Sequence, residues 1–341
     1  MEQQKWIVDE VAADINKAGG IRGKPVVIEY YDTALDPTKA VAQMGKAIDK
    51  KCLCIIGPVV EQECKACMPL AVREGMFCYS ATGTENVAKT FAPWMIQATI
   101  RTEDVLTNIP EMYLAQEKDI KSMVALIQPL YPLLVTYWTG ISKNLEKAGI
   151  KTYKFIEVPD GLLDYGPLIV RALNTGANSL YISVTEGISA KMIKELNNRN
   201  FDMTNVLCGS EAVSTKTFLE ETAGSNEGVY STASPDYEPT PMFANYNSRY
   251  RASHGGVGLH SMAYAHGDML LMIKKHFEQL KITGDPAKLK EERNKIKDMA
   301  FNQSKFEGIQ ATYRVVKGIA HDMPVYLFQV QDGKFVLVEK R

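Results

Sequence analysis

The sequence predicts an α/β protein of two lobes, and three observations support that prediction. Its 341 residues correspond to about two domains at roughly 150 residues each. Short apolar runs alternate with helical patterns of about 10–15 residues, which is typical of a parallel sheet with crossover connections, and this alternation occurs twice along the chain. Near the end, Asp332-Gly333 separates two β-rich runs and predicts a two-residue hairpin turn.

The first half of the chain begins inside a helix. Ile7, Val8, Val11 and Ile15 recur at helical spacing, and Gly19-Gly20 ends the run. Asp36-Pro37 places an N-cap residue directly before a first-turn proline, which predicts a second helix there. The other elements expected in this half are strands over residues 26–31, 52–56 and 76–79, a helix to about residue 74, and a long helix over residues 103–116.

The second half repeats the α/β pattern and then adds an antiparallel tail. The elements expected here are strands over residues 122–127, 152–157, 179–185 and 206–208, and helices ending near 148, starting near 164, and over 188–198 and 262–280. Phe243, Tyr246 and Tyr250 share one helical face. Residues 324–330 and 335–338 flank the predicted hairpin turn.

The net charge argues against nucleic-acid binding, and the hydropathy argues against a membrane-spanning helix. Lys and Arg number 39 and Asp and Glu number 40, so the net charge of −1 provides no general basic field for nucleic acid. The longest apolar run, residues 124–138, contains Pro129 and Pro132 and is shorter than the ~20 residues that a membrane-spanning helix needs.

The residue patterns of common enzymes and cofactor sites do not occur. The sequence contains no GxGxxG, GxxxxGK[ST], GxSxG or HExxH, and its five histidines lack metal-ligand spacing. A nucleotide-dependent enzyme of this class would normally carry a glycine-rich turn after its first strand. We therefore expect no cofactor and no resident metal, and catalysis is disfavoured.

Five of the six cysteines lie close together in the sequence, at residues 52, 54, 64, 67 and 78. Cys64 and Cys67 fall one helical turn apart on an apolar face, whereas zinc ligands usually sit on tight turns. Buried free thiols are the favoured interpretation, because a free cysteine behaves as a small apolar side chain. A Cys54–Cys78 disulfide and a metal site are the alternatives.

Several short motifs occur in a fixed order along almost the whole chain. They are DINKAGGIRGKP at residues 14–25, Tyr31-Asp32 with DPTKAV at 36–41, IIGP at 55–58, YSATGT at 79–84, GSE at 209–211, EGV at 227–229 and Ser-Pro at 234–235. In this order they resemble the type 1 periplasmic substrate-binding proteins, in the branch of the leucine/isoleucine/valine-binding proteins of ABC importers.

The resemblance implies two Rossmann-like lobes joined by a three-segment hinge. Lobe 1 is expected to comprise residues 1–100 plus 236–305, and lobe 2 residues 101–235 plus 306–341. The hinge would lie near residues 100–101, near 234–236 and after Phe306. Family members carry an export signal, a strand and a loop before their first helix, whereas Met1 here already lies in that helix. A trimmed chain or a misplaced start codon explains this difference more simply than a fold without that strand.

The resemblance also implies that a small molecule is captured in a cleft between the lobes without being transformed. The first-choice ligand is a branched-chain or other neutral amino acid, delivered to an ABC permease and its ATPase. The protein would then be periplasmic or a cell-surface lipoprotein. Two alternatives stay open, a ligand-sensing regulator that binds an amide or aromatic acid, and an enzyme on the same scaffold.

The resemblance places the first group of ligand contacts in lobe 1. Thr82, Gly83 and Thr84 match the family's loop that contacts the ligand's amino and carboxylate groups. Glu61 stands where the family usually has Ser, and its carboxylate would repel a ligand carboxylate unless it is protonated or turned away. Alternatively, Glu61 simply occupies the first turn of a helix, where the dipole favours it, and the 82–84 loop is an ordinary turn.

The second group of contacts lies in lobe 2. Glu211 matches the acidic residue that pairs with the ligand's ammonium, with a solvated loop glutamate as the alternative. Thr185 and Glu186 lie near the family's aromatic contact. Tyr131, within the apolar stretch 129–134, could receive an apolar ligand group, although core packing explains that stretch equally well.

Overall fold

The computed structural model divides the chain into two compact units. It describes residues 2–341 except 117–118, 214–216, 235–236, 257 and 260, and it leaves the side chains of Glu211, Ser261 and Met262 undescribed. Unit 1 comprises residues 1–102 and 238–323, and unit 2 comprises residues 103–237 and 324–341. Each unit has its own sheet and core, so the predicted α/β fold of two lobes is confirmed.

Unit 1 is built on a six-stranded sheet with the order β1-β2-β3-β12-β11-β10. Its strands are β1 (Cys54–Ile56), β2 (Phe77–Ser80), β3 (Met95–Gln97), β10 (Phe306–Glu307), β11 (Thr312–Val316) and β12 (Ile319–His321). The pairs from β1 to β12 are parallel, and β12, β11 and β10 pair antiparallel.

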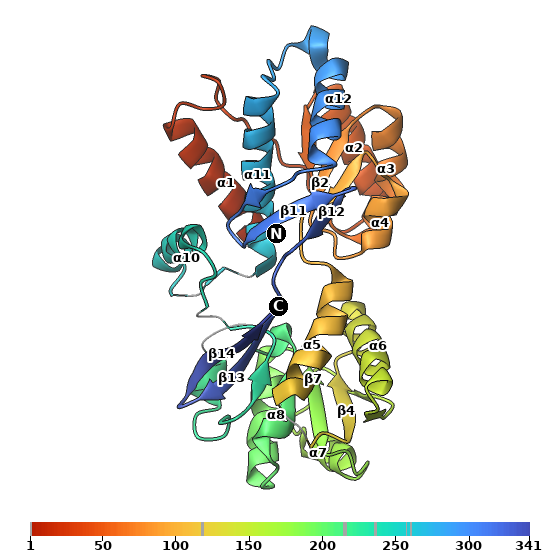
Figure 1. Ribbon diagram of the computed structural model, residues 1–341, viewed down its shortest axis with the longest axis vertical. Coiled ribbons are helices and arrows are strands. Elements are labelled where there is room, and N and C mark those ends of the chain that lie inside the picture. The colour runs from red at the N-terminus through yellow and green to blue at the C-terminus, as the bar shows by residue number, and fades with distance from the viewer. Residues whose placement is uncertain (1, 117–118, 214–216, 235–236, 257, 260) are drawn as a thin grey trace. The chain divides into compact units, whose positions relative to one another are not determined.

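Helices cover both faces of this sheet (Figure 1). One face carries α2 (Pro37–Asp49), α3 (Glu61–Arg73) and α4 (Glu85–Thr90), whose apolar side chains pack with Cys78 and Met95. The other face carries α11 (Ser261–Gln279) and α12 (Leu289–Ala300), packed on Phe77 and Tyr79. The predicted N-terminal helix is α1 (Glu2–Lys17), and it buries Ile7, Val8, Val11 and Ile15 against α11 and α10 (Pro241–Ser253).

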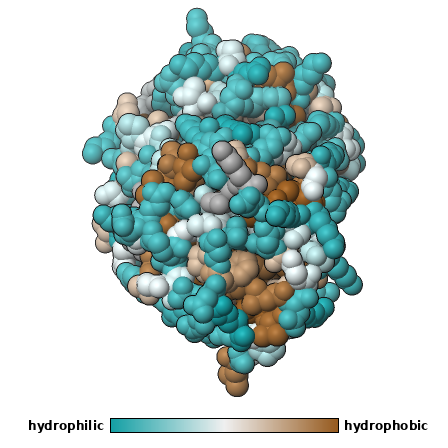
Figure 2. Space-filling model, turned by 60° about the horizontal axis from the view of Figure 1, so that its bottom comes forward, coloured by the Kyte–Doolittle hydropathy of each residue, from teal (hydrophilic) through white to brown (hydrophobic). Residues whose placement is uncertain are grey.

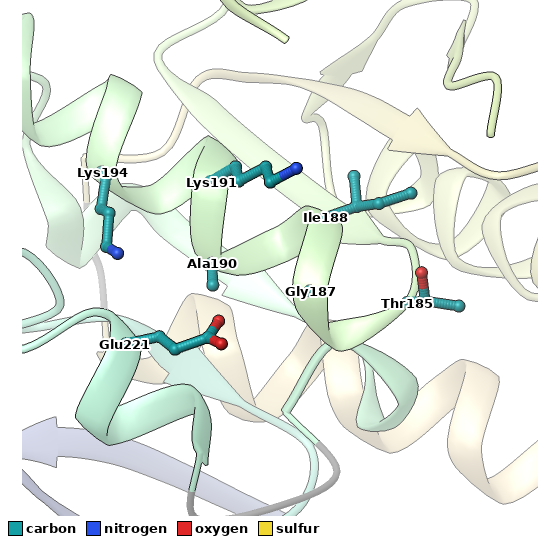
Figure 3. A pocket seen from close by; sticks show the side chains of 7 residues that line it. All are labelled: Thr185, Gly187, Ile188, Ala190, Lys191, Lys194 and Glu221. Carbon is teal, nitrogen blue, oxygen red and sulfur yellow. The ribbon is translucent and has the colours of Figure 1, made fainter. Parts of the chain in front are cut away.

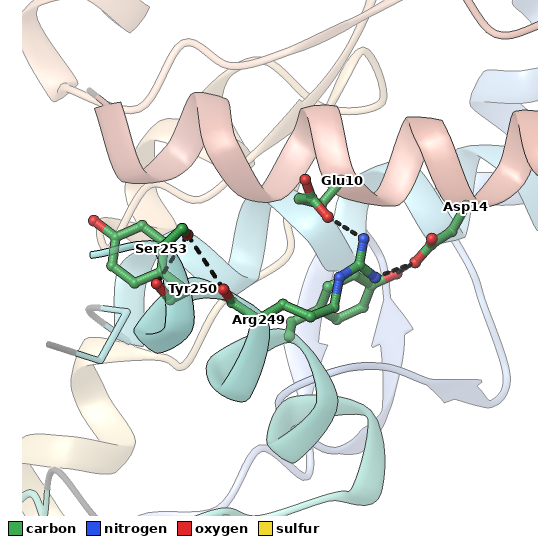
Figure 4. A network of polar contacts seen from close by, with 6 residues as sticks. Glu10, Asp14, Arg249, Tyr250 and Ser253 are labelled. Carbon is green, nitrogen blue, oxygen red and sulfur yellow. Dashed lines mark hydrogen bonds and ion pairs between the residues drawn. The ribbon is translucent and has the colours of Figure 1, made fainter. Parts of the chain in front are cut away.

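An ion-pair network fastens α10 to α1 (Figure 4). The guanidinium of Arg249 bonds to Glu10 and, at 2.6 Å, to Oδ2 of Asp14. Tyr246 donates a 3.0 Å hydrogen bond to the same Asp14 oxygen. These contacts join segments more than 200 residues apart, since Tyr246 and Asp14 are separated by 232 positions.

Unit 2 is built on an eight-stranded sheet with the order β14-β13-β9-β8-β7-β4-β5, and β6 also pairs with β4. Its strands are β4 (Ser122–Ile127), β5 (Lys151–Thr152), β6 (Ile156–Glu157), β7 (Ser179–Ser183), β8 (Val206–Cys208), β9 (Tyr230–Ser231), β13 (Tyr326–Gln331) and β14 (Lys334–Lys340). The strand predicted over 152–157 is thus two short pieces, both parallel to β4.

The helices of unit 2 also lie on two faces of its sheet. The main core packs α7 (Gly166–Leu173), α8 (Glu186–Asn198) and α9 (Thr217–Glu221) against apolar residues of β4, β7 and β8. On the other face lie α5 (Thr102–Gln116) and α6 (Pro132–Lys147), where Trp138 stacks on Tyr181 with ring centroids 5.8 Å apart. Short 3₁₀ turns are η1 (Met203–Asn205), η2 (Ser210–Val213) and, in unit 1, η3 (Pro286–Lys288).

The predicted hairpin is confirmed between β13 and β14. Asp332 and Gly333 both have positive φ, 51° and 70°, which is the conformation of a type I′ turn and suits the twist of the strands it joins. The Asp36 cap is also confirmed, because its side chain accepts hydrogen bonds from the backbone N–H groups of Thr38 and Lys39.

Two predictions about sheet membership are wrong. Residues 26–31 form no strand. Within the described part of the chain they pair with no strand, and the Asn16 side chain instead bonds the N–H and C=O of Val26. Residues 306–323 belong to unit 1 rather than to the second lobe, because β12 pairs with β3 and brings β11 and β10 with it. The third crossing therefore lies at residues 323–324. Of the predicted crossing at 234–236, Pro235 and Asp236 lie outside the described residues.

The six cysteines are free thiols. A Cys54–Cys78 disulfide does not form, because Cys78 is the register partner of Ile55 while Cys54 is the partner of Phe77. Neighbouring positions of a strand point to opposite faces, so these two side chains lie on different sides of the sheet. Burial raises the pKa of the Cys64 thiol to about 12 and that of Cys67 to about 11.

The helices and the surface show two further features. In the described part of the chain, no helix has both the length and the apolar character needed to cross a bilayer. On the face shown in Figure 2, apolar residues stand in separate patches among hydrophilic ones.

Candidate functional site

The parallel strands of unit 1 bring four of the predicted residues together at one edge of its sheet. β1, β2 and β3 run in the same direction, so the segments that follow them share the carboxyl edge, where ligands of open α/β sheets bind. Glu61 is the first residue of α3, after β1, and Thr82, Gly83 and Thr84 follow β2. The Oγ1 of Thr84 donates a 3.3 Å hydrogen bond to Oε2 of Glu61.

The loop from β2 to α4 is held by its own polar groups. Thr82 is 1% exposed, and its backbone N–H donates to Oγ of Ser80 at 3.0 Å. Oγ1 of Thr82 in turn accepts from the N–H of Thr84 at 3.4 Å. The carbonyl oxygen of Gly83 accepts a hydrogen bond from Thr102. Thr84 occupies the N-cap position of α4, but its side chain makes no capping bond and is turned to Glu61 instead.

Glu61 is a partly exposed carboxylate. Its Oε1 lies 2.6 Å from Nζ of Lys65, one helical turn along α3, and the two side chains are 39% and 65% exposed. The hydrogen bond from Lys65 holds the pKa of Glu61 below its usual value. The side chain is therefore ionised at neutral pH rather than protonated.

One polar residue at this edge was not predicted from the sequence. Gln97 ends β3, is fully buried, and is the register partner of Ser80. Its Nε2 donates to the carbonyl of Ile100 at 3.5 Å, while its Oε1 is buried and has no hydrogen-bond partner among the described residues. A glutamine that ends a buried strand is the signal that could have identified it.

The carboxyl edge of unit 2 is organised around Gln128, a second glutamine that sequence reasoning missed. Gln128 follows β4, is 1% exposed, and donates through Nε2 to Asp160 in the loop after β6. Its Oε1 accepts from the backbone N–H of Thr185 at 2.9 Å. The side chain thus fixes the loops that follow three parallel strands, including the predicted contact Thr185.

Thr185 and Glu186 form the start of α8. Thr185 is the N-cap residue and Glu186 the first helical residue, and both are half-buried. The backbone of Glu211 lies in η2, just after β8, at the same edge of the sheet. The side chain of Glu211 lies outside the described residues, so its predicted pairing with an ammonium group stays a prediction.

Tyr131 belongs to an exposed apolar loop rather than to the core. It occupies the N-cap position of α6 without a side-chain capping bond and is 45% exposed, and its neighbours Leu130 and Leu133 are 64% and 54% exposed. Leu163, in the loop after β6, is 99% exposed. The stretch after β4 therefore offers accessible apolar surface at the carboxyl edge.

A hollow of about 450 Å³ lies beside α8 (Figure 3). It is lined by Thr185, Gly187, Ile188, Ala190, Lys191, Lys194 and Glu221. Thr185 belongs to the predicted contacts, and Lys191 and Lys194 of α8 and Glu221 of α9 add charged side chains to the lining. Among the described side chains, no cluster of three or more His, Cys, Asp or Glu is arranged to hold a metal ion.

The chain is thus an α/β protein of two units, and each unit carries polar loops at the carboxyl ends of its parallel strands. The family model "Periplasmic binding protein" matches residues 2–334, and the chain therefore belongs to the periplasmic binding proteins. This confirms the resemblance found in the sequence motifs.

Individual relatives have low sequence identity to this chain but align with two thirds of it or more. A leucine-, isoleucine-, valine-, threonine- and alanine-binding protein of Pseudomonas aeruginosa is 24% identical over 67% of this chain, and the match spans 60% of its own length. The branched-chain amino acid transporter substrate-binding protein LivJ of Streptococcus pneumoniae, in complex with isoleucine, aligns with a TM-score of 0.71 at 14% identity, covering 99% of this chain and 94% of its own. An ABC-transporter solute-binding protein of R. palustris, in complex with 4-hydroxybenzoate, aligns with a TM-score of 0.74 at 17% identity, covering 100% of this chain and 92% of its own. These structural likenesses establish the fold.

Proposed function

We propose that this protein is the extracytoplasmic solute-binding component of an ABC importer. It binds a small molecule, in the first place a branched-chain or other neutral amino acid, and presents it to a membrane permease driven by an ATPase. The observation that carries this proposal is membership of the periplasmic binding proteins over residues 2–334. The relatives named above, two of them amino-acid binders, support the choice of ligand.

The two carboxyl edges offer complementary kinds of contact. In unit 1, Thr82, Gly83 and Thr84 are the proposed contacts for the polar part of the ligand. In unit 2, Thr185, Glu186 and Glu211 are the proposed polar contacts, and the apolar loop around Tyr131 suits a hydrocarbon side chain. Micromolar affinity requires a net binding free energy of about −8 kcal/mol. A few hydrogen bonds of about 1 kcal/mol each, together with apolar burial, are of the right size.

The role proposed for the protein is binding without bond chemistry. Its side chains would hold and orient the ligand, and the ligand would leave unchanged. Incubation of a bound amino acid with the purified protein should therefore return the same compound, measured by mass spectrometry. Conversion of the compound in proportion to protein concentration would contradict this proposal and favour an enzyme on the same scaffold.

A thermal-shift screen followed by calorimetry tests the ligand class. A ligand that binds only the native state raises the melting temperature, by an amount set by its concentration relative to Kd. We expect leucine, isoleucine or valine to raise it, whereas benzoate and primary amides serve as the alternative ligands. Failure of every neutral amino acid to raise the melting temperature would remove the proposed ligand class.

Glu211→Gln tests the proposed ammonium contact. Removing one partner of a desolvated charge pair leaves the other unpaired and costs about 2 kcal/mol or more. Glu220→Gln, on the exposed surface of α9, is the matched control and should bind normally. Unchanged amino-acid affinity in Glu211→Gln would exclude Glu211 from the site.

A further inference from the structure

The carboxyl edge of unit 1 already holds a negative charge of its own. Glu61 is the first residue of α3, a helix of 13 residues whose N-cap, Val60, provides no side-chain cap. Free N–H groups and the helix dipole make such a position favourable for an anion. In this chain the Glu61 carboxylate occupies that position, and Thr84 donates its hydroxyl hydrogen bond to it.

The ion pair with Lys65 leaves this carboxylate available to a ligand. Both side chains are substantially exposed, at 39% for Glu61 and 65% for Lys65, and exposed pairs of this kind are weak. Lys65 also contacts Oε1, whereas the bond from Thr84 to Oε2 is long at 3.3 Å. A ligand donor can therefore approach Oε2 without displacing a strong partner.

A second acceptor at the same edge points to a ligand that donates hydrogen bonds. Gln97 and Ser80 are register partners, so their side chains lie on one face of the sheet. Cys78 and Met95, two positions earlier on the same strands, pack with Cys64 and Cys67 of α3, which places Gln97 on the face that α3 covers. The buried Oε1 of Gln97 has no donor among the described residues, and such a buried acceptor is costly unless something donates to it.

We propose that Glu61 makes the carboxyl edge of unit 1 a receptor for the ammonium group of the ligand rather than for its carboxylate. The inference rests on the solute-binding function proposed above, specifies which end of the ligand this unit recognises, and makes Glu61 an acidic contact of the ammonium group in addition to the one proposed for Glu211. A ligand carboxylate would bring no donor to this edge and would be repelled by the Glu61 charge, whereas an ammonium group supplies hydrogen-bond donors. Glu61 is then a specificity-determining residue of this chain.

The test separates the two ends of one amino acid. Three probes share the same hydrocarbon group: leucine, its decarboxylated analogue 3-methylbutylamine, and its deaminated analogue 4-methylpentanoate. Each is titrated by calorimetry into the wild-type protein and into Glu61→Gln, which removes the charge and keeps the shape. Lys65→Met is the matched control, because it removes the same ion pair but retains the carboxylate.

We expect the wild-type protein to bind the amine at least tenfold more tightly than the acid. Glu61→Gln should weaken leucine and the amine tenfold or more and should strengthen the acid. Lys65→Met should leave binding of the amine unchanged or improve it. The proposal is overturned if Glu61→Gln binds leucine as the wild-type protein does, or if Lys65→Met loses as much affinity as Glu61→Gln.

These outcomes also separate the proposal from the function on which it rests. Leucine binding that is independent of Glu61 overturns the role of Glu61 and leaves the amino-acid function standing. Amine binding that depends on Glu61, without binding of any neutral amino acid, supports the role of Glu61 and removes the proposed ligand class. Absence of binding by all three probes overturns both.

Discussion

A buried chain of three side chains in unit 1 makes the stability of the protein depend on pH. Nδ1 of His276 on α11 lies 2.8 Å from the hydroxyl of Tyr79 on β2, and its Nε2 lies 2.9 Å from Oε1 of Gln303. Nε2 of Gln303 donates to the carbonyl of Lys305 at 2.7 Å, which leaves Oε1 as the acceptor. His276 must then donate from Nε2 and accept at Nδ1 from Tyr79, and this is the neutral imidazole.

The size of the pH effect follows from the pKa of His276. Burial lowers that pKa from 6.5 to about 4, because the fully buried ring is poorly solvated when charged. Between these two values the unfolded chain binds a proton that the folded protein does not bind. The contribution of His276 to stability is therefore lost as the pH falls from about 6.5 to about 4, by about 3 kcal/mol in total at 1.36 kcal/mol per pKa unit.

The substitution His276→Gln isolates this contribution. Urea unfolding of the wild-type protein and of the variant, followed by circular dichroism between about pH 7 and about pH 4, gives the free energy of unfolding of each. Every other titrating group is common to both proteins, so its effect cancels in the difference. We expect the wild-type protein to be the more stable near neutral pH and its advantage to shrink by about 2–3 kcal/mol on acidification. An advantage that stays constant within about 0.5 kcal/mol would refute the assigned protonation state.

Three further predictions concern stability. Burial raises the pKa of Asp268 on α11 to about 7, so the contribution of Asp268 to stability should be lost as the pH rises from about 4 through 7, opposite in sign to the contribution of His276. Asp268→Asn should remove this loss, and a pH-independent difference in free energy of unfolding between the two proteins would contradict the prediction. Gly140→Ala should cost about 1–3 kcal/mol in urea unfolding, because its Cβ would lie 2.3 Å from Cδ1 of Leu106. Gly45→Ala is the helical control, because a Cβ at Gly45 would have no atom within 4 Å, and it should instead stabilise the protein by up to about 1 kcal/mol. Equal effects of the two substitutions would count against the packing between α5 and α6. Arg249→Met should lower the free energy of unfolding by about 1 kcal/mol and should lower the urea midpoint, because the ion pairs of Arg249 are only part-buried. An unchanged urea midpoint would show that the ion pairs with α1 contribute nothing to stability.

Elements with local signals were predicted well. The helix α1 follows from apolar spacing, the start of α2 from an aspartate before a proline, and the β13–β14 turn from Asp332-Gly333. Each signal depends on residues within a few positions of one another. The ordered motifs extended this to the family, since they occur throughout the matched range.

The candidate site was predicted in part. The sequence placed Glu61 and the 82–84 loop together through the resemblance, and the structure shows Glu61 bonded to Thr84. It did not identify Gln97 or Gln128, because their importance depends on burial and on partners in distant segments. The roles of Thr185, Glu186, Glu211 and Tyr131 in ligand binding are still predictions.

By itself, the sequence determined the two-lobe α/β class, the helices and turns with local caps, and the family. Tertiary structure alone decided that residues 26–31 pair with no described strand, that residues 306–323 complete the sheet of unit 1, and that Cys54 and Cys78 lie on opposite faces. The physical reason is the range of the interactions. Helix caps and turns are stabilised by neighbours in the chain, whereas strand pairing and burial depend on contacts between segments up to hundreds of residues apart.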